Sequence, residues 1–175
     1  MNKKTMYIAA AVIVIVIVVA IAGAYVLMNP GGGGGGTTET VYTMGNATSL
    51  QYNVNITTSG VVGTYMFAGK NIGTANLTLR IDATPVVGAD TYSSILSATD
   101  ESAWSNATGT WATSDFATDW GQTWSPLWSG YIDHNPNWKA GDVDITYTDN
   151  SGNEIVIYGI VINPTLADSL FTPPT

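Results

Sequence analysis

The feature that most constrains this chain is an uncharged and strongly apolar run of 23 residues, from Met6 to Met28. As an α-helix it would be about 35 Å long, which exceeds the roughly 30 Å hydrocarbon core of a bilayer. Twelve of its residues are Val, Ile or Leu, and each favours insertion at the bilayer centre by about 0.3–0.6 kcal/mol. In hydrocarbon a helix satisfies its own backbone hydrogen bonds, which overrides the weak helix propensity of β-branched residues. We therefore predict a transmembrane helix over residues 6–28, with the lipid bilayer as a partner.

The positive charges around this run predict its orientation. Lys3 and Lys4 precede it, and no further Lys or Arg occurs before Lys70. Because cations are retained on the cytoplasmic side, residues 1–5 are expected in the cytoplasm and the C-terminal part outside it, as in a single-pass signal-anchor protein of the cell membrane. Two alternatives remain open. One is cleavage of a signal peptide after Ala24, although the apolar core is longer than the usual 7–15 residues. The other is a pilin-type leader that packs in a filament.

A flexible linker is predicted over residues 29–40. Pro30 ends the helix because proline cannot continue it, and six consecutive glycines follow, from Gly31 to Gly36. A glycine run behaves as random coil. Residues 41–175 are then long enough to form one extracytoplasmic domain with its own hydrophobic core.

Composition excludes several classes of function for that domain. The chain has no cysteine and one histidine, which removes disulfide frameworks, cysteine zinc sites and most histidine-based catalysis. After the apolar run it carries three cations against 13 acidic residues, a balance that repels nucleic acid and anionic lipid. No phosphate loop, dinucleotide fingerprint or nucleophile elbow occurs. We accordingly predict no cofactor, no metal and no nucleic-acid partner.

Alternating apolar and polar residues predict that the domain is mainly β. From Ser49 to Thr57 apolar side chains alternate with Gln and Asn, and Ala75 to Ala83 repeats the pattern, which is typical of half-buried antiparallel strands. The predicted fold is one curved antiparallel sheet of about seven strands, with minor α structure. The further strands are expected over 61–68, 91–98, 101–104, 110–113, 142–148 and 154–162, the last of them central because both its faces are apolar.

One stretch breaks the two-residue period. Between residues 116 and 131, aromatic and apolar residues recur at spacings of three and four, which indicates helix. Pro126 is unsuited to a helix interior but fits the first position of a helix. We predict two short Trp-rich helices, about 115–123 and 126–133, packed on the sheet, and a last turn over 165–171.

All six tryptophans lie within 35 residues, from Trp104 to Trp138. Each buries about 150–250 Å², so one interpretation is an aromatic stripe that closes one face of the sheet. The other is a concave site, since ligand pockets combine aromatic walls with a few polar groups. Under this second interpretation the candidate ligand-binding residues are Trp104, Trp111, Trp120, Trp124 and Trp128.

Four Asn-X-Thr sequons provide candidate glycosylation sites, which are Asn46, Asn55, Asn76 and Asn106. In an exported protein, used sequons would mark solvent-facing positions. Unused sequons are the alternative, because Asn and Thr are common in this chain.

Several acidic residues are candidate sites. Asp142, Asp144 and Asp149 leave a calcium interpretation open, although their spacing does not match an EF-hand loop and Asp-Asn-Ser-Gly is ordinary turn sequence. The pairs Asp100–Glu101 and Asp115–Asp119 lie near tryptophans and would suit glycoside cleavage if two carboxyl groups faced each other. His134 is expected in a solvated loop.

The order of an apolar anchor, a glycine run and a Tyr/Thr/Asn-rich β domain resembles a group of uncharacterised archaeal membrane-anchored surface proteins. Segments 42–50, 69–74 and 163–171 carry this resemblance, which implies surface anchoring but no activity. More distantly, residues 63–111 resemble the strand meander of bacterial lipoprotein-carrier proteins. In those proteins a curved sheet plugged by helices holds lipid chains, so this resemblance implies an apolar cavity between the sheet and the helices.

Together these features predict a membrane-anchored cell-surface protein without enzymatic activity. Its outer domain is expected to bind a small apolar or carbohydrate-bearing ligand. One alternative is a structural subunit of a surface filament or envelope layer, with envelope proteins as partners. Another is a carbohydrate-active enzyme.

Overall fold

The computed structural model describes residues 40–174, and residues 41–175 form one compact unit. The predicted cytoplasmic residues 1–5, the predicted membrane helix 6–28 and nearly all of the predicted linker lie outside the described residues. Within the described range, no helix is both long and apolar enough to cross a membrane.

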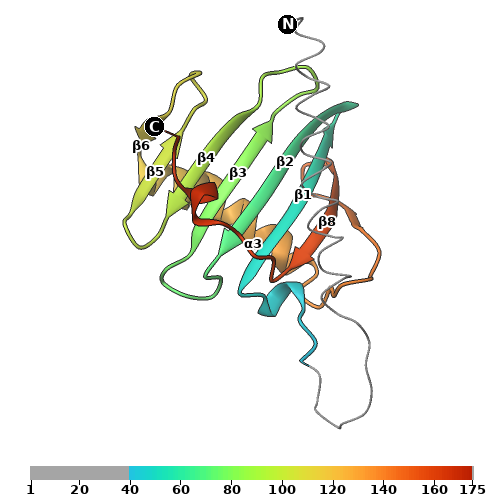
Figure 1. Ribbon diagram of the computed structural model, residues 1–175. Helices are drawn as coiled ribbons and strands as arrows, with labels where there is room; N and C mark the ends of the chain where they lie inside the picture. Colours follow the sequence, from blue (N-terminus) through green and yellow to red (C-terminus); the bar gives the residue numbers. More distant parts are fainter. Residues whose placement is uncertain (1–39, 175) are drawn as a thin grey trace, which may run out of the picture. The chain divides into compact units, whose positions relative to one another are not determined.

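The unit is built on a single eight-stranded antiparallel sheet (Figure 1). Six strands follow one another as a meander, and a C-terminal hairpin then places β8 beside β1, which gives the order β6-β5-β4-β3-β2-β1-β8-β7. The prediction of a mainly β domain is confirmed, with eight strands instead of about seven. The strands are β1 (Ser49–Thr58), β2 (Val61–Lys70), β3 (Thr78–Thr84), β4 (Tyr92–Ser97), β5 (Ser102–Ser105), β6 (Ala112–Ser114), β7 (Ile145–Thr148) and β8 (Glu154–Ile162).

The hairpin of β1 and β2 shows how local sequence builds this sheet. Its ten residue pairs run from Ser49↔Lys70 to Thr58↔Val61 without a register shift. The two-residue turn Ser59-Gly60 has positive φ at both positions, 51° and 81°, as the twist of a tight hairpin requires. Along β1 the apolar residues point to one face of the sheet and the amides to the other, so the two faces differ in polarity.

One helical segment of 19 residues covers one face of the sheet. It consists of α2 (Phe116–Thr118), the π-helical turn η2 (Asp119–Trp124) and α3 (Ser125–His134), which follow without a break. The prediction of two separate helices was therefore wrong. The Ser125 amide donates to the Trp120 carbonyl, five residues earlier. The wider π turn ends at Trp124, two residues before Pro126. The proline ring would clash with a carbonyl in a regular α-helix, and the wider turn allows the helix to continue through the proline.

Aromatic rings fill the space between this helical segment and the sheet. Tyr52 stacks on Phe67 with ring centroids 5.2 Å apart and on Trp128 at 5.3 Å. Trp124 meets Phe67 edge-on at 6.3 Å. At Gly69 a Cβ atom would lie 2.6 Å from the Trp128 ring, so the absence of a side chain there allows the close approach. These rings occupy the space in which the resemblance to lipoprotein carriers implied a cavity.

The C-terminal segment crosses the opposite face of the sheet, so that it and α3 lie on different sides (Figure 1). It contains η3 (Asp168–Phe171), a short helical turn within the range predicted for one. Phe171 packs with Ala68 and Ile95 into a second, smaller apolar cluster. We call residues 163–174 the C-terminal strap.

Candidate functional site: the groove beside α3

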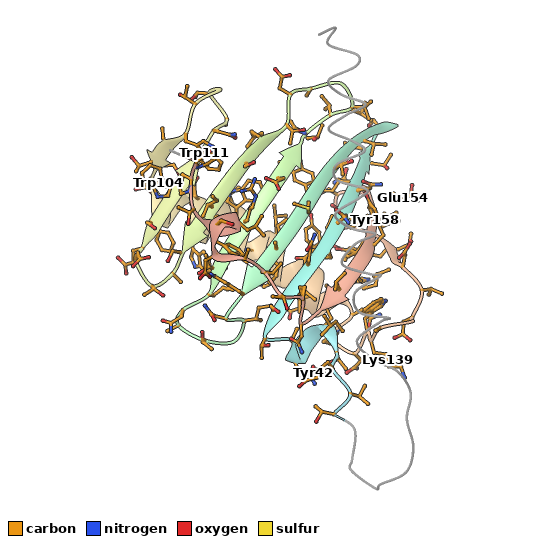
Figure 2. All side chains as sticks on the ribbon, in the orientation of Figure 1. Tyr42, Trp104, Trp111, Lys139, Glu154 and Tyr158 are labelled. Carbon is orange, nitrogen blue, oxygen red and sulfur yellow. The ribbon has the colours of Figure 1, made fainter. Side chains whose placement is uncertain are left out.

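The structure divides the five candidate tryptophans between the two faces of the sheet. Trp124 and Trp128 are only 5% and 4% exposed, and Trp120 packs at the edge of the same core. Trp104 and Trp111 are half-buried on the other face, in the cluster that includes the strap (Figure 2). The five side chains therefore do not meet in one site, and their role in ligand binding stays a prediction.

A groove lies between α3 and the β7–β8 hairpin. A hollow of about 550 Å³ separates α3 from the β7–β8 hairpin. We call it the α3–hairpin groove. Its lining comprises Pro126, Leu127, Gly130, Tyr131 and His134 from α3, Ile56, Tyr147, Thr148 and Ile155 from the strands, and Asp149, Asn150 and Asn153 from the turn that joins β7 to β8.

His134 and Tyr147 form an aromatic stack at this groove, with ring centroids 3.5 Å apart and planes inclined by 18°. His134 is solvent-exposed, as expected. It is the last residue of α3, not part of a loop. The helix continues to this point and ends at Asn135, because a residue that precedes proline disfavours α-helical geometry and Pro136 follows. His134 also lines a neighbouring hollow of about 650 Å³ that contains Asp142 and Asp144.

Tyr131 also lines the groove. Tyr131 is only 5% exposed, and its hydroxyl makes no hydrogen bond within residues 40–174. In the same range no buried side-chain nitrogen or oxygen lacks a partner, so this hydroxyl is reached by solvent through the groove it lines. Burial raises the pKa of Tyr131 well above its usual range, and the nearby Tyr147 hydroxyl raises it further. Tyr131 therefore stays a neutral hydrogen-bond donor at physiological pH.

Asp149 supplies the negative charge of the groove and closes the β7–β8 turn. Its Oδ1 accepts hydrogen bonds from the backbone amides of Ser151 (2.8 Å) and Asn153 (2.9 Å), and its Oδ2 accepts one from the Asn153 side chain at 2.8 Å. These bonds, those from Asn153 foremost, lower the pKa of Asp149. The carboxylate is thus ionised and held in one orientation at neutral pH.

Two of the other acidic candidates have local structural contacts. Asp142 Oδ2 accepts the Lys139 amide at 3.0 Å. Asp115 Oδ1 accepts the Thr118 amide at 2.7 Å and caps the helical segment. In the described part of the chain, no group of three or more His, Asp or Glu side chains is arranged to hold a metal ion.

The groove was not predicted from the sequence. The helical segment follows β6, at one edge of the sheet, and its last residue, His134, stacks on Tyr147 of β7, at the other edge. The groove lies where the C-terminal part of α3 meets the β7–β8 hairpin. Its position depends on contacts between residues far apart in the sequence, so no local pattern indicates it.

Comparisons with protein-family models, with curated proteins and with solved structures find no match to this chain. The class to which it belongs is therefore defined by the fold and the groove alone. It is an antiparallel β domain, covered on one face by a single helix, with an aromatic groove of a size that suits a small ligand.

Proposed function

We propose that this chain is a membrane-anchored cell-surface protein whose outer domain binds a carbohydrate-bearing ligand in the α3–hairpin groove, without chemical conversion of that ligand. The main support for a carbohydrate-bearing ligand is the mixed apolar and polar lining of the groove. Tyrosine rings and aliphatic side chains stand beside a carboxylate, two asparagine side chains and an imidazole. A sugar ring presents an apolar face together with a rim of hydroxyl groups, and such a lining offers a surface for each.

An acyl chain suits this groove less well than a sugar does. Placing hydrocarbon against the Asp149 carboxylate and the Asn150 side chain would remove water from polar groups, at a cost of about 1–3 kcal/mol for each group left unsatisfied. The most apolar space of the domain, between the helix and the sheet, is already filled by the rings of Tyr52, Phe67 and Trp128. Between the two ligand classes expected from the sequence, these contacts favour the carbohydrate-bearing one.

Two features of the groove support binding without catalysis. Glycoside hydrolysis uses two carboxyl groups that flank the bond, and Asp149 is the one carboxylate among the residues that line the groove in the described range. Its pKa is lowered, whereas a general acid at neutral pH requires a raised pKa.

The surface location rests on the sequence. The apolar run from Met6 to Met28 follows Lys3 and Lys4, which predicts that the domain is outside the cytoplasm. The test is to add protease to intact cells that carry a C-terminal epitope tag on the full chain. Loss of the epitope is expected, and a protected epitope would refute the location.

Ligand binding is tested by titrating the full chain in detergent with neutral trisaccharides of glucose, galactose and N-acetylglucosamine, with calorimetry as the readout. Binding of at least one trisaccharide is expected, with loss of at least tenfold in affinity for Tyr147→Ala. The matched control is Tyr158→Ala, since Tyr158 lies on β8 of the same hairpin but on the opposite face of the sheet, where its hydroxyl contacts Asn55 (Figure 2). Equal loss for both variants, or no binding of any trisaccharide, would contradict the proposal.

A further inference from the structure

The four sequon asparagines differ in the hydrogen bonds of their side-chain amides and in the pairing of their backbone, and these two differences together separate them as modification sites. We infer that Asn76 and Asn106 are attachment sites for N-linked glycans and that Asn46 and Asn55 are not. The inference rests on the proposed extracytoplasmic location of the domain. It concerns the Nδ2 atom, because that nitrogen forms the bond to the sugar and must be free and accessible.

Asn106 lies in the loop that joins β5 to β6. Its Oδ1 accepts a hydrogen bond of 2.5 Å from the backbone amide of Ser93. A backbone amide only donates, so the oxygen of the side-chain amide must face Ser93 and the nitrogen must point away from it. Within the described residues Nδ2 of Asn106 donates no hydrogen bond. The Gly109 amide donates to the Asn106 carbonyl at 2.8 Å and closes the turn, and the sequon residues Ala107 and Thr108 are exposed.

Asn76 is exposed in the loop between β2 and β3. Its Oδ1 accepts a hydrogen bond of 3.1 Å from the Thr99 hydroxyl, and its backbone carbonyl accepts one of 3.1 Å from the Asn71 side chain. These bonds hold the loop while leaving the Asn76 Nδ2 atom without a hydrogen bond in the described part of the chain. Attachment of a sugar to Nδ2 of either Asn76 or Asn106 would leave the bonds to the corresponding Oδ1 intact.

Both the oxygen and the nitrogen of the Asn46 side-chain amide form hydrogen bonds. Its Oδ1 accepts the Thr43 backbone amide at 2.6 Å, and its Nδ2 donates to the Val41 carbonyl at 3.3 Å. A sugar on this nitrogen would compete with the second bond, which connects Asn46 to the residues that enter the domain.

Asn55 is excluded by its place in the sheet. It lies on β1, which is paired on both sides, with β2 and with β8. Its Oδ1 accepts the hydroxyl groups of Thr64 (3.0 Å) and Tyr158 (3.4 Å). Its Nδ2, like that of Asn106, donates no hydrogen bond within the described residues, and both side chains are half-buried, so the exclusion of Asn55 rests on the strand pairing. A transferase must bind the peptide around the asparagine, and a strand with neighbours on both sides is not available for that contact.

Neither proposed glycan site is among the residues that line the α3–hairpin groove. Sugars attached at Asn76 and Asn106 would extend from the β2–β3 and β5–β6 loops, which join strand ends. The groove would thus remain open to an external ligand in the glycosylated protein.

The test is glycopeptide mass spectrometry of the full chain, isolated from the cells that naturally produce it. Glycan mass is expected on the peptides that contain Asn76 and Asn106 and on neither of the other two. Thr78→Ala and Thr108→Ala should each remove one glycan, because they destroy the sequon while the asparagine stays in place. Thr78→Ser and Thr108→Ser are the matched controls that should retain it.

A bare Asn76 or Asn106, or a glycan on Asn46 or Asn55, would overturn the inference. The protease test on intact cells separates this failure from failure of the proposed location. If the domain is digested from outside and the two asparagines are bare, the glycan inference alone fails. If the domain is protected and the asparagines are bare, both fail.

Discussion

Nη1 of Arg80, on β3, donates a hydrogen bond of 3.0 Å to the backbone carbonyl oxygen of Leu170, in the C-terminal strap. The same guanidinium pairs with Asp82, with Nη2 and Oδ1 2.9 Å apart, and both side chains are about one-fifth exposed. The strap has no strand pairing with the face that it crosses. This charge-assisted contact and the apolar packing of Phe171 therefore attach it to the sheet.

Arg80→Met should destabilise the domain by about 2 kcal/mol, because it removes a charge-assisted hydrogen bond and leaves the Asp82 carboxylate without its cation. Urea unfolding, followed by tryptophan fluorescence, measures the change. Lys70→Met is the comparison, since Lys70 pairs with Asp168, whose side chain is 95% exposed, and an exposed pair contributes about 0–1 kcal/mol. A larger loss for Lys70→Met than for Arg80→Met would show that the strap is held differently.

Gly69→Ala should destabilise the domain by about 1–3 kcal/mol. Its new Cβ would lie 2.6 Å from the Trp128 ring, so the helix would have to move away from the sheet. Gly130→Ala in α3 provides the control, because nothing lies within 4 Å of the new methyl group and alanine favours a helix interior by about 0.5–1 kcal/mol over glycine. Thermal melting should shift in opposite directions for the two variants. A shift in the same direction would be inconsistent with this packing.

Asn163→Ala should lower the free energy of unfolding by about 2–3 kcal/mol for two separate reasons. Oδ1 of Asn163 accepts hydrogen bonds from the Thr48 amide (2.8 Å), the Thr48 hydroxyl (3.0 Å) and the Ser49 amide (3.3 Å). Its φ is also +54°, a conformation that costs an alanine about 1–2 kcal/mol. Asn163→Gly loses the hydrogen bonds but keeps the backbone freedom, so it should unfold at a higher urea concentration than Asn163→Ala. Equal midpoints would mean that backbone strain has no part in the effect.

Stability should fall in alkali because of the buried tyrosines. Burial raises the pKa of Tyr52 and of Tyr131 above the ordinary value of 10.0. Above that pH the unfolded chain loses protons that the folded state retains, so the stability contributed below pH 10 is lost as the pH rises further. Tyr131→Phe should make the urea midpoint less sensitive to pH between about 9 and 12. Tyr42→Phe, at a side chain that is 49% exposed, is the control, and an unchanged slope for Tyr131→Phe would contradict the assignment.

The sheet was largely predictable because the alternation that marks a strand involves residues close together in the sequence. The alternation from Ser49 to Thr57 placed β1 within one residue of its observed end, and the apolar run 154–162 gave the bounds of β8. The helical period between 116 and 131 was also read correctly. The single helix was not predicted, because Pro126 ends a regular α-helix and the local sequence pattern does not indicate a π turn.

The site was much less predictable, and the tryptophans show why. Trp104 and Trp128 belong to one cluster in sequence, but strand register turns Trp104 to the face of the sheet opposite the one on which Trp128 packs. The groove depends on the position of α3 across the sheet, and thus on contacts between residues as distant as Tyr52 and Trp128.

The sequence by itself thus determined the polarity pattern, the strands, the composition and the four sequons, since each is a property of residues within a few positions of one another. Only the tertiary structure decided where the groove lies, which aromatic rings are core, and how the sequon asparagine side chains are hydrogen-bonded. Those outcomes depend on how the helical segment packs across the sheet and on hydrogen bonds between segments that are far apart along the chain.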